Sequence, residues 1–226
     1  MKNTTVITEA ARARVAIENG DTVTAFQILL ALTEEAKKEE MREASKGRGI
    51  LAVHKAAEKI LKNSQSAFGS QYDGVLSLAF ADDKGVLICE NACVVEFKLE
   101  SAPSLPQVPQ EKMASYPADG LRRKFSRTDG APLTLPTVAE LKSLIAAKKA
   151  ERKAAKSEEK YIYTTLSTES GEVIWLDAER LLTMLCALPS CTAREGAPCG
   201  KYTSVYFEAE NGRGLLLPCR PPKNVE

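Results

Sequence analysis

The sequence predicts an α+β protein in which helices pack against antiparallel sheet. Residues 174–220 read as a strand, a helix and two further strands. Residues 75–99 contain three short apolar runs separated by turn residues, which is typical of an antiparallel meander. A segment with helical periodicity precedes the meander as well. The order helix, strands, helix, strands therefore defines the predicted core.

Composition places the chain among ordinary globular proteins. It has 226 residues, of which 44% are hydrophobic and 27% are charged. No apolar run approaches the roughly 18 to 20 residues that cross a bilayer, and the N-terminus lacks a basic-then-apolar signal pattern. We expect a cytoplasmic protein that does not associate with membranes.

Residues 1–46 are predicted to form a pair of antiparallel helices. Thr8 can cap a first helix that runs to Ile17, and Asn19-Gly20 supplies its stop. A second helix begins at Asp21 or Thr22 and runs to about Glu40.

The next segment holds a third helix and the meander. Apolar residues at helical spacing predict a helix from Ile50 to near Asn63. Strands are predicted at 75–80, 86–89 and 93–99, joined by turns rich in Asp, Asn and Gly.

Residues 101–159 are predicted to form a Pro-rich, basic insertion. Six prolines between Ser101 and Pro136 prevent regular helix and interrupt sheet pairing. Thr137 then caps a helix over 137–157, whose first half is apolar enough to dock. Its second half carries almost no large apolar residue and is expected to project into water.

The C-terminal part completes the core domain, which is predicted to comprise residues 47–100 and 160–222. A strand pair is expected at 161–166 and 173–176, after which Asp177 caps a helix. The apolar stripe of this helix has the spacing i, i+3, i+4, i+7 and consists of Leu181, Met184, Leu185 and Leu188.

Pro189 and Ser190 end that helix, and a loop with Cys, Gly and Pro follows. Strands at 203–209 and 214–220 then form a hairpin. Asn211-Gly212 between them predicts a type I′ turn.

Positive charge is concentrated in one region. Residues 112–160 contain twelve Lys/Arg and six Asp/Glu, a balance of +6, which leaves −5 for the rest of the chain. Such a region can contact nucleic-acid phosphates, although an exposed soluble helix with a charged linker explains it too. The candidate phosphate contacts are Arg122, Arg123, Lys124, Arg127, Lys142, Lys148, Lys149, Arg152, Lys153 and Lys156, with Lys160 beside them.

Catalytic chemistry finds little support in the sequence. We find no phosphate-cradling Gly-rich loop and no nucleophile elbow, and His54 is the only histidine. Cys89 and Cys93 have a spacing seen in some zinc sites but lack a second pair, so no metal is expected. Cys199 is the most plausible reactive thiol and lacks a base to activate it. We therefore expect a non-enzymatic protein without a cofactor.

Several segments resemble one domain of the bacterial DNA polymerase sliding clamp, the β-clamp family. Residues 175–188 are similar to the last helix of the clamp, and 204–208 with 215–220 are similar to its terminal hairpin. Residues 75–96 are similar to a strand, turn and strand of the family. The resemblance covers about 125 residues. In overall style the chain also resembles uncharacterised phage and prophage proteins.

The resemblance implies a fold and an activity. In this family, six such domains form a ring around duplex DNA. A one-domain chain would therefore have to form a homo-oligomer to build such a ring. The helices at 50–63 and 177–188 would face DNA. The wall of a groove for partner peptides would lie at Leu217, Pro218, Cys219 and Arg220.

Two functions remain open at this stage. The first is a phage-encoded, clamp-fold binding protein that associates with DNA or the replication machinery. The alternative is a phage inhibitor that binds a host nucleic-acid enzyme or defence nuclease, in the manner of an anti-CRISPR protein. DNA and a host or phage protein are accordingly the candidate partners.

Overall fold

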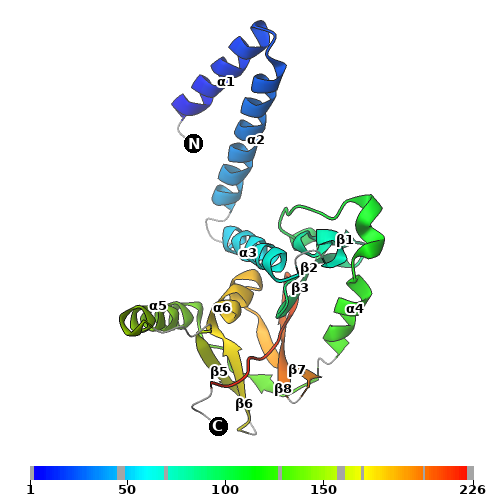
Figure 1. Cartoon of the computed structure of the whole chain (residues 1–226), viewed down its shortest axis with the longest axis vertical. Coiled ribbons are helices and arrows are strands. Elements are labelled where there is room, and N and C mark those ends of the chain that lie inside the picture. The colour runs from blue at the N-terminus through cyan, green and yellow to red at the C-terminus, as the bar shows by residue number, and fades with distance from the viewer. Residues whose placement is uncertain are drawn as a thin grey trace. The chain divides into compact units, whose positions relative to one another are not determined.

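The computed structural model describes residues 3–44, 49–68, 71–126, 129–156, 161–168, 171–200 and 202–222. The chain divides into two compact units, Met1–Leu51 and Ala52–Glu226 (Figure 1). The predicted insertion 101–159 lies within the second unit. No helix among the described residues is both long and apolar enough to cross a membrane.

The first unit is a helical hairpin of α1 (Asn3–Glu18) and α2 (Thr22–Ala44). Gly20 adopts a φ of +76°, which closes α1 and turns the chain. Asp21 then caps α2, because its Oδ1 accepts a hydrogen bond from the Thr24 amide at 3.0 Å. The predicted helix pair is confirmed, although α1 begins five residues before Thr8.

The second unit is built on a seven-stranded antiparallel sheet with the order β1-β2-β3-β9-β8-β7-β4. Its strands, in chain order, are β1 Phe80–Asp82, β2 Gly85–Cys89, β3 Cys93–Phe97, β4 Pro132–Leu133, β7 Thr192–Cys199, β8 Tyr202–Ala209 and β9 Gly212–Leu216.

Six of these strands belong to a repeated arrangement of one helix followed by three strands. Helix α3 (Ile50–Phe68) precedes β1, β2 and β3, and helix α6 (Ala178–Ala187) precedes β7, β8 and β9. The third strands of the two repeats pair at the centre of the sheet, where Val95 lies opposite Gly214. From either end of this six-strand segment, the first, second and third strands of one repeat therefore follow one another toward the centre.

Helices α3 and α6 cover one face of the sheet (Figure 1). Gly214 lets α6 approach the central strands closely, since a Cβ there would lie 2.6 Å from Met184 Sδ and 2.8 Å from Leu188 Cδ1. The predicted stripe of α6 is buried as expected. The side chains buried from the two helices include Val53, Ala57, Ile60, Leu61, Leu181, Met184, Leu185 and Leu188.

The Pro-rich connection covers the opposite face. Tyr116 stacks on Phe80 with ring centroids 4.9 Å apart, and Phe125 meets Tyr206 edge to face. Tyr116 and Phe125 belong to a second apolar cluster, which also contains Leu87. The described residues of the connection include the short α-helix α4 (Ala118–Arg122) and 3₁₀ helices at Gln110–Ser115 and Arg123–Ser126, and it ends in the edge strand β4. The second unit thus has three layers, and its third layer is the segment that was expected to be an insertion.

The remaining elements flank α6. Helix α5 (Val138–Ala155) begins with the predicted cap, since Thr137 Oγ1 accepts from the Glu140 amide and Glu140 accepts from the Thr137 amide. Strands β5 (Tyr163–Ser167) and β6 (Val173–Asp177) form a separate two-stranded sheet that leads into α6. Both the helix and the strand pair were predicted.

Three local predictions were wrong. Residues 75–77 belong to a 3₁₀ helix, Gln71–Ser77, which contains Gly74 at a φ of +75°. Residues 192–199 form β7 instead of a loop. A register shift between Glu195 and Pro198 accommodates Gly196 and the proline in this strand.

The third wrong prediction concerns the last hairpin. Ala209 pairs with Gly212, so the turn residues are Glu210 and Asn211. Lys156 and Ser190 are the only described non-glycine residues with positive φ, which excludes a type I′ turn at Asn211-Gly212. Gly212 instead allows close packing between strands, because a Cβ there would lie 2.3 Å from the Glu96 carbonyl oxygen.

Candidate nucleic-acid interface

Cationic side chains from two helices distant in sequence converge on Glu179, in the first turn of α6. Lys149 of α5 forms an ion pair with it, with Nζ 2.6 Å from Oε1. This contact lowers the pKa of Glu179, and the nearby charges of Lys59 and Arg152 lower it further. Cations of α3 and α5 therefore lie near the N-terminus of α6.

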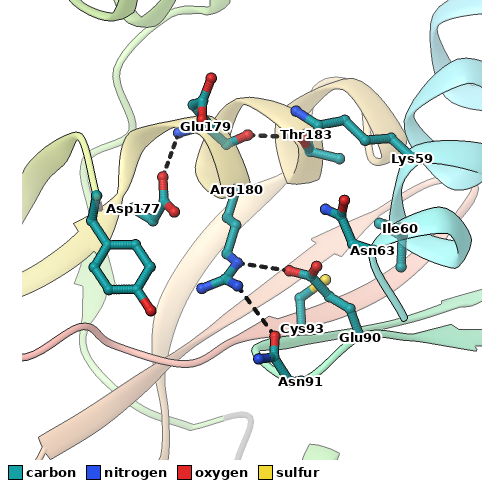
Figure 2. A pocket seen from close by; sticks show the side chains of 11 residues that line it. Lys59, Ile60, Asn63, Glu90, Asn91, Cys93, Asp177, Glu179, Arg180 and Thr183 are labelled. Carbon is teal, nitrogen blue, oxygen red and sulfur yellow. Dashed lines mark hydrogen bonds and ion pairs between the residues drawn. The ribbon is translucent and has the colours of Figure 1, made fainter. Parts of the chain in front are cut away.

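A cavity of about 400 Å³ opens beside Glu179 (Figure 2). It lies among α3, α6 and the turn between β2 and β3, and most of its lining is polar. Its lining residues are Lys59, Ile60, Asn63, Glu90, Asn91, Cys93, Tyr161, Asp177, Glu179, Arg180 and Thr183.

Arg180 is held inside this cavity by residues of the β2–β3 turn. Its Nε lies 2.8 Å from Glu90 Oε1, and Nη2 donates to Asn91 Oδ1 at 3.2 Å. Figure 2 shows the guanidinium directed at both residues. Tyr161 faces the same group, with its ring centroid 5.8 Å from Cζ. Because the Glu90 side chain is only 2% exposed, this pair ties α6 to the sheet.

Asp177 and Cys93, two further ionisable residues of the cavity, have structural roles. Asp177 caps α6 by accepting from the Glu179 amide at 2.9 Å, and burial raises its pKa. Burial raises the pKa of Cys93 well above that of a free thiol, so its nucleophilic thiolate is suppressed. In the described parts of the chain, no three His, Cys, Asp or Glu side chains are grouped as metal ligands.

Helix α6 does not present the DNA-facing surface that the clamp resemblance implied for residues 177–188. Its residues are buried or half-buried, because its inner side packs on the sheet and α5 packs beside it. The exposed surface is formed instead by α5 and α3.

Helix α3 contributes a row of lysines that the sequence analysis missed. Lys55, Lys59 and Lys62 are all exposed and follow one another at i, i+4 and i+7. That spacing was visible in the sequence. The net charge of −5 outside residues 112–160 conceals these lysines among acidic residues.

The basic candidates on α5 are largely exposed, and several make local contacts. Lys148 pairs with Glu151 at 2.8 Å, and Arg152 donates to the Tyr161 carbonyl. Lys142, Lys153 and Lys156 are exposed. Arg127 and Lys160 lie outside the described residues.

The candidates near α4 do not join this surface. Arg122 has a side chain only 10% exposed and is bonded to Asp82 and Glu96, so the structure assigns it to an internal ion-pair network. Arg123 and Lys124 are exposed, in the layer on the other side of the sheet.

The four residues predicted as a groove wall have different surroundings. Leu217 lines an apolar cavity of about 230 Å³ together with Leu121, Lys124 and Leu215. Cys219 is bonded through its amide to the Trp175 carbonyl, and burial followed by the charge of Asp177 raises its pKa. Pro218 is half-buried and Arg220 is exposed. Of these, Leu217 alone lines this cavity.

His54 and Cys199 lie outside the cation cluster. His54 Nε2 is 2.9 Å from the Ser104 carbonyl, which is a packing contact between α3 and the connection. Cys199 is an exposed thiol at the end of β7.

Comparison of the chain with models of known protein families, with curated proteins and with solved structures finds no match to any of them.

Proposed function

We propose that the second unit is a non-enzymatic, clamp-like domain that binds the phosphates of duplex DNA on the surface formed by α3 and α5, as an accessory of DNA replication. The observation that carries this proposal is the convergence of Lys59, Lys149 and Arg152 around Glu179. The doubled arrangement of a helix and three strands supports the clamp-like interpretation.

The charge of the two helices favours a polyanion. Three cations on α3 and five on α5 oppose one carboxylate on α3 and two on α5, a net balance of +5. Duplex DNA offers one negative charge per ~1.7 Å of axis, so a row of lysines along a helix can meet several phosphates at once.

The same surface predicts binding without sequence preference. Lysine contacts phosphates as a point charge, and no aromatic side chain lies within α5 to stack on bases. Affinity should therefore depend on salt and on duplex length, and it should not depend on base sequence.

A labelled duplex titrated across a salt series tests the proposal. Replacing Lys55, Lys59 and Lys62 together by alanine should reduce the slope of log affinity against log salt by about 2 to 3. The matched control is Arg123→Ala with Lys124→Ala, which removes exposed cations from the opposite layer and should leave the slope nearly unchanged. Equal losses from both sets, or binding insensitive to salt, would contradict the proposal.

The apolar cavity at Leu217 favours a second candidate, a protein inhibitor that holds a partner segment there. Its lining is mostly apolar, with Lys124 at the edge, and suits one apolar side chain next to an acidic group. This function predicts a stoichiometric complex with a nucleic-acid enzyme that forms without DNA and is weakened by Ala197→Trp, which would fill the cavity. An unchanged complex would exclude the cavity as its binding site.

A further inference from the structure

The helical hairpin of the first unit exposes large apolar side chains on α2. Val23 and Phe26 are each 67% exposed, Leu30 is 50% exposed and Leu29 is 47% exposed. Val23, Phe26 and Leu30 are spaced i, i+3 and i+7, so they share one face of the helix, and Leu29 adjoins it. These four residues are called the α2 stripe below.

The contact between α1 and α2 does not use these residues. The buried apolar side chains of this unit, among those described, are Ala13, Ala16 and Ala25. Three alanines allow the helices to approach closely but bury little apolar surface, and a helical unit of this size needs a larger core or oligomerisation. The hairpin therefore carries the apolar residues of a core on its outer surface.

We propose that the α2 stripe binds the α2 stripe of a second copy of this chain, so that two helical hairpins form a four-helix dimer. The inference is independent of the proposed DNA binding. It assigns the first unit the role of joining two copies of the second.

The charge pattern of α2 favours an identical partner. No residue from Thr22 to Thr33 is charged, so two copies of this segment can meet without like-charge repulsion. A two-fold interface places the same patch on both subunits, and such dimers are the commonest soluble oligomers.

The stripe would form the centre of such an interface. Its four side chains expose roughly 400 Å² in each copy, about half of the ~800 Å² per partner in a standard interface, so neighbouring residues of the hairpin must supply the rest. Interfaces of this kind have an apolar centre and a polar rim. Thr22, Gln27 and Thr33 are polar neighbours that can supply that rim.

Light scattering and sedimentation of the full chain over about a hundredfold range of concentration test the inference. The wild-type protein should show a mass twice 24.5 kDa that falls toward one copy on dilution. Leu30→Glu should raise the dissociation constant by about a hundredfold or more, because a symmetrical interface loses both leucines. The matched control is Leu99→Glu, the same change at a residue of the second unit that is 51% exposed, and it should leave the mass unchanged.

Hydrogen exchange of the wild-type chain keeps the test independent of the folding of the variant. Amides of residues 22–33 should lose protection when the protein is diluted into the monomer range. A wild-type monomer at every concentration would overturn the inference, with the stripe then covered by the chain's own second unit or by another protein. A dimer that persists in Leu30→Glu, with unchanged exchange at 22–33, would overturn it too.

Discussion

Arg122 and Asp82 form a two-point ion pair, with Nη1 2.6 Å from Oδ2 and Nη2 2.7 Å from Oδ1. The Nε of the same arginine donates to Glu96 at 2.5 Å, and Glu96 also accepts two hydrogen bonds from Arg213. One guanidinium therefore joins α4 to β1 and β3. This network holds the Pro-rich connection on its face of the sheet.

Replacing Arg122 by alanine should reduce the free energy of unfolding by about 3 kcal/mol, because Asp82 loses its arginine partner and Glu96 keeps only Arg213 in a poorly solvated site. Arg122→Lys should lose about half as much, since lysine keeps the charge but cannot bond to Asp82 at two points. Urea unfolding followed by circular dichroism measures both changes.

Arg123→Ala is the control for this pair of variants. Arg123 is the next residue in the sequence and is exposed, so its loss should change the free energy of unfolding by less than about 0.5 kcal/mol. Equal destabilisation by Arg122→Ala and Arg123→Ala would show that the network does not hold the third layer.

Stability should fall in acid through Asp82. Its hydrogen bonds from Arg122 lower its pKa below the ordinary value of 3.8. A carboxyl whose pKa is depressed by folding stabilises the protein fully above its unfolded pKa, and that stability is lost as pH falls through the folded pKa. Urea midpoints measured from pH 6 down to pH 2 should decline below about pH 4. Asp82→Asn should show a smaller decline, and an equal decline in both proteins would contradict the assignment.

Elements specified by neighbouring residues were predicted from the sequence. Thr137 and Glu140 lie three residues apart and make the cap of α5 by themselves. The stripe of α6 follows from periodicity, and Asp177 caps it. The third layer has no such signal, because Tyr116 and Phe125 follow no helical or strand period and are buried only by residues distant in sequence.

The candidate site was likewise predicted only in part. Arg122 belongs to a basic cluster in the sequence, and its partner Asp82 lies 40 residues earlier, beyond the reach of a local pattern. Lys149 was predicted as a surface cation, but its ion pair with Glu179 depends on how α5 packs against α6. Charge composition located a basic region, and tertiary packing decided which of its residues share one surface.

Asp177 offers a second pH-dependent test with the opposite sign. Burial raises its pKa, so its contribution to stability is greatest at low pH and is lost as pH rises through the folded pKa. Asp177→Asn keeps the capping oxygen without the charge, and it should match or exceed wild-type stability at pH 7. Asp177→Ala loses the cap and should cost about 1 kcal/mol. Thermal unfolding at pH 7 and pH 4 distinguishes them, and equal losses in both variants would show that the carboxylate charge itself is needed.

Glu179 should limit the affinity of the α3–α5 surface for DNA, because it neutralises Lys149 and lines the same cavity as Lys59. Glu179→Gln removes one negative charge and releases Lys149 to contact a phosphate, which should tighten duplex binding about threefold to tenfold at low salt and steepen the salt dependence by about 1. Glu9→Gln is the control, since Glu9 forms a comparable ion pair with Arg12 in the first unit. In a Lys149→Ala background, Glu179→Gln should give a smaller gain, because the released cation is no longer there. Titration of a fluorescent duplex with wild type, Glu179→Gln, Glu9→Gln, Lys149→Ala and the Lys149→Ala, Glu179→Gln double variant measures these effects. If Glu179→Gln weakens binding or has the same effect in both backgrounds, Lys149 does not contact phosphate and the α3–α5 surface is not the DNA site.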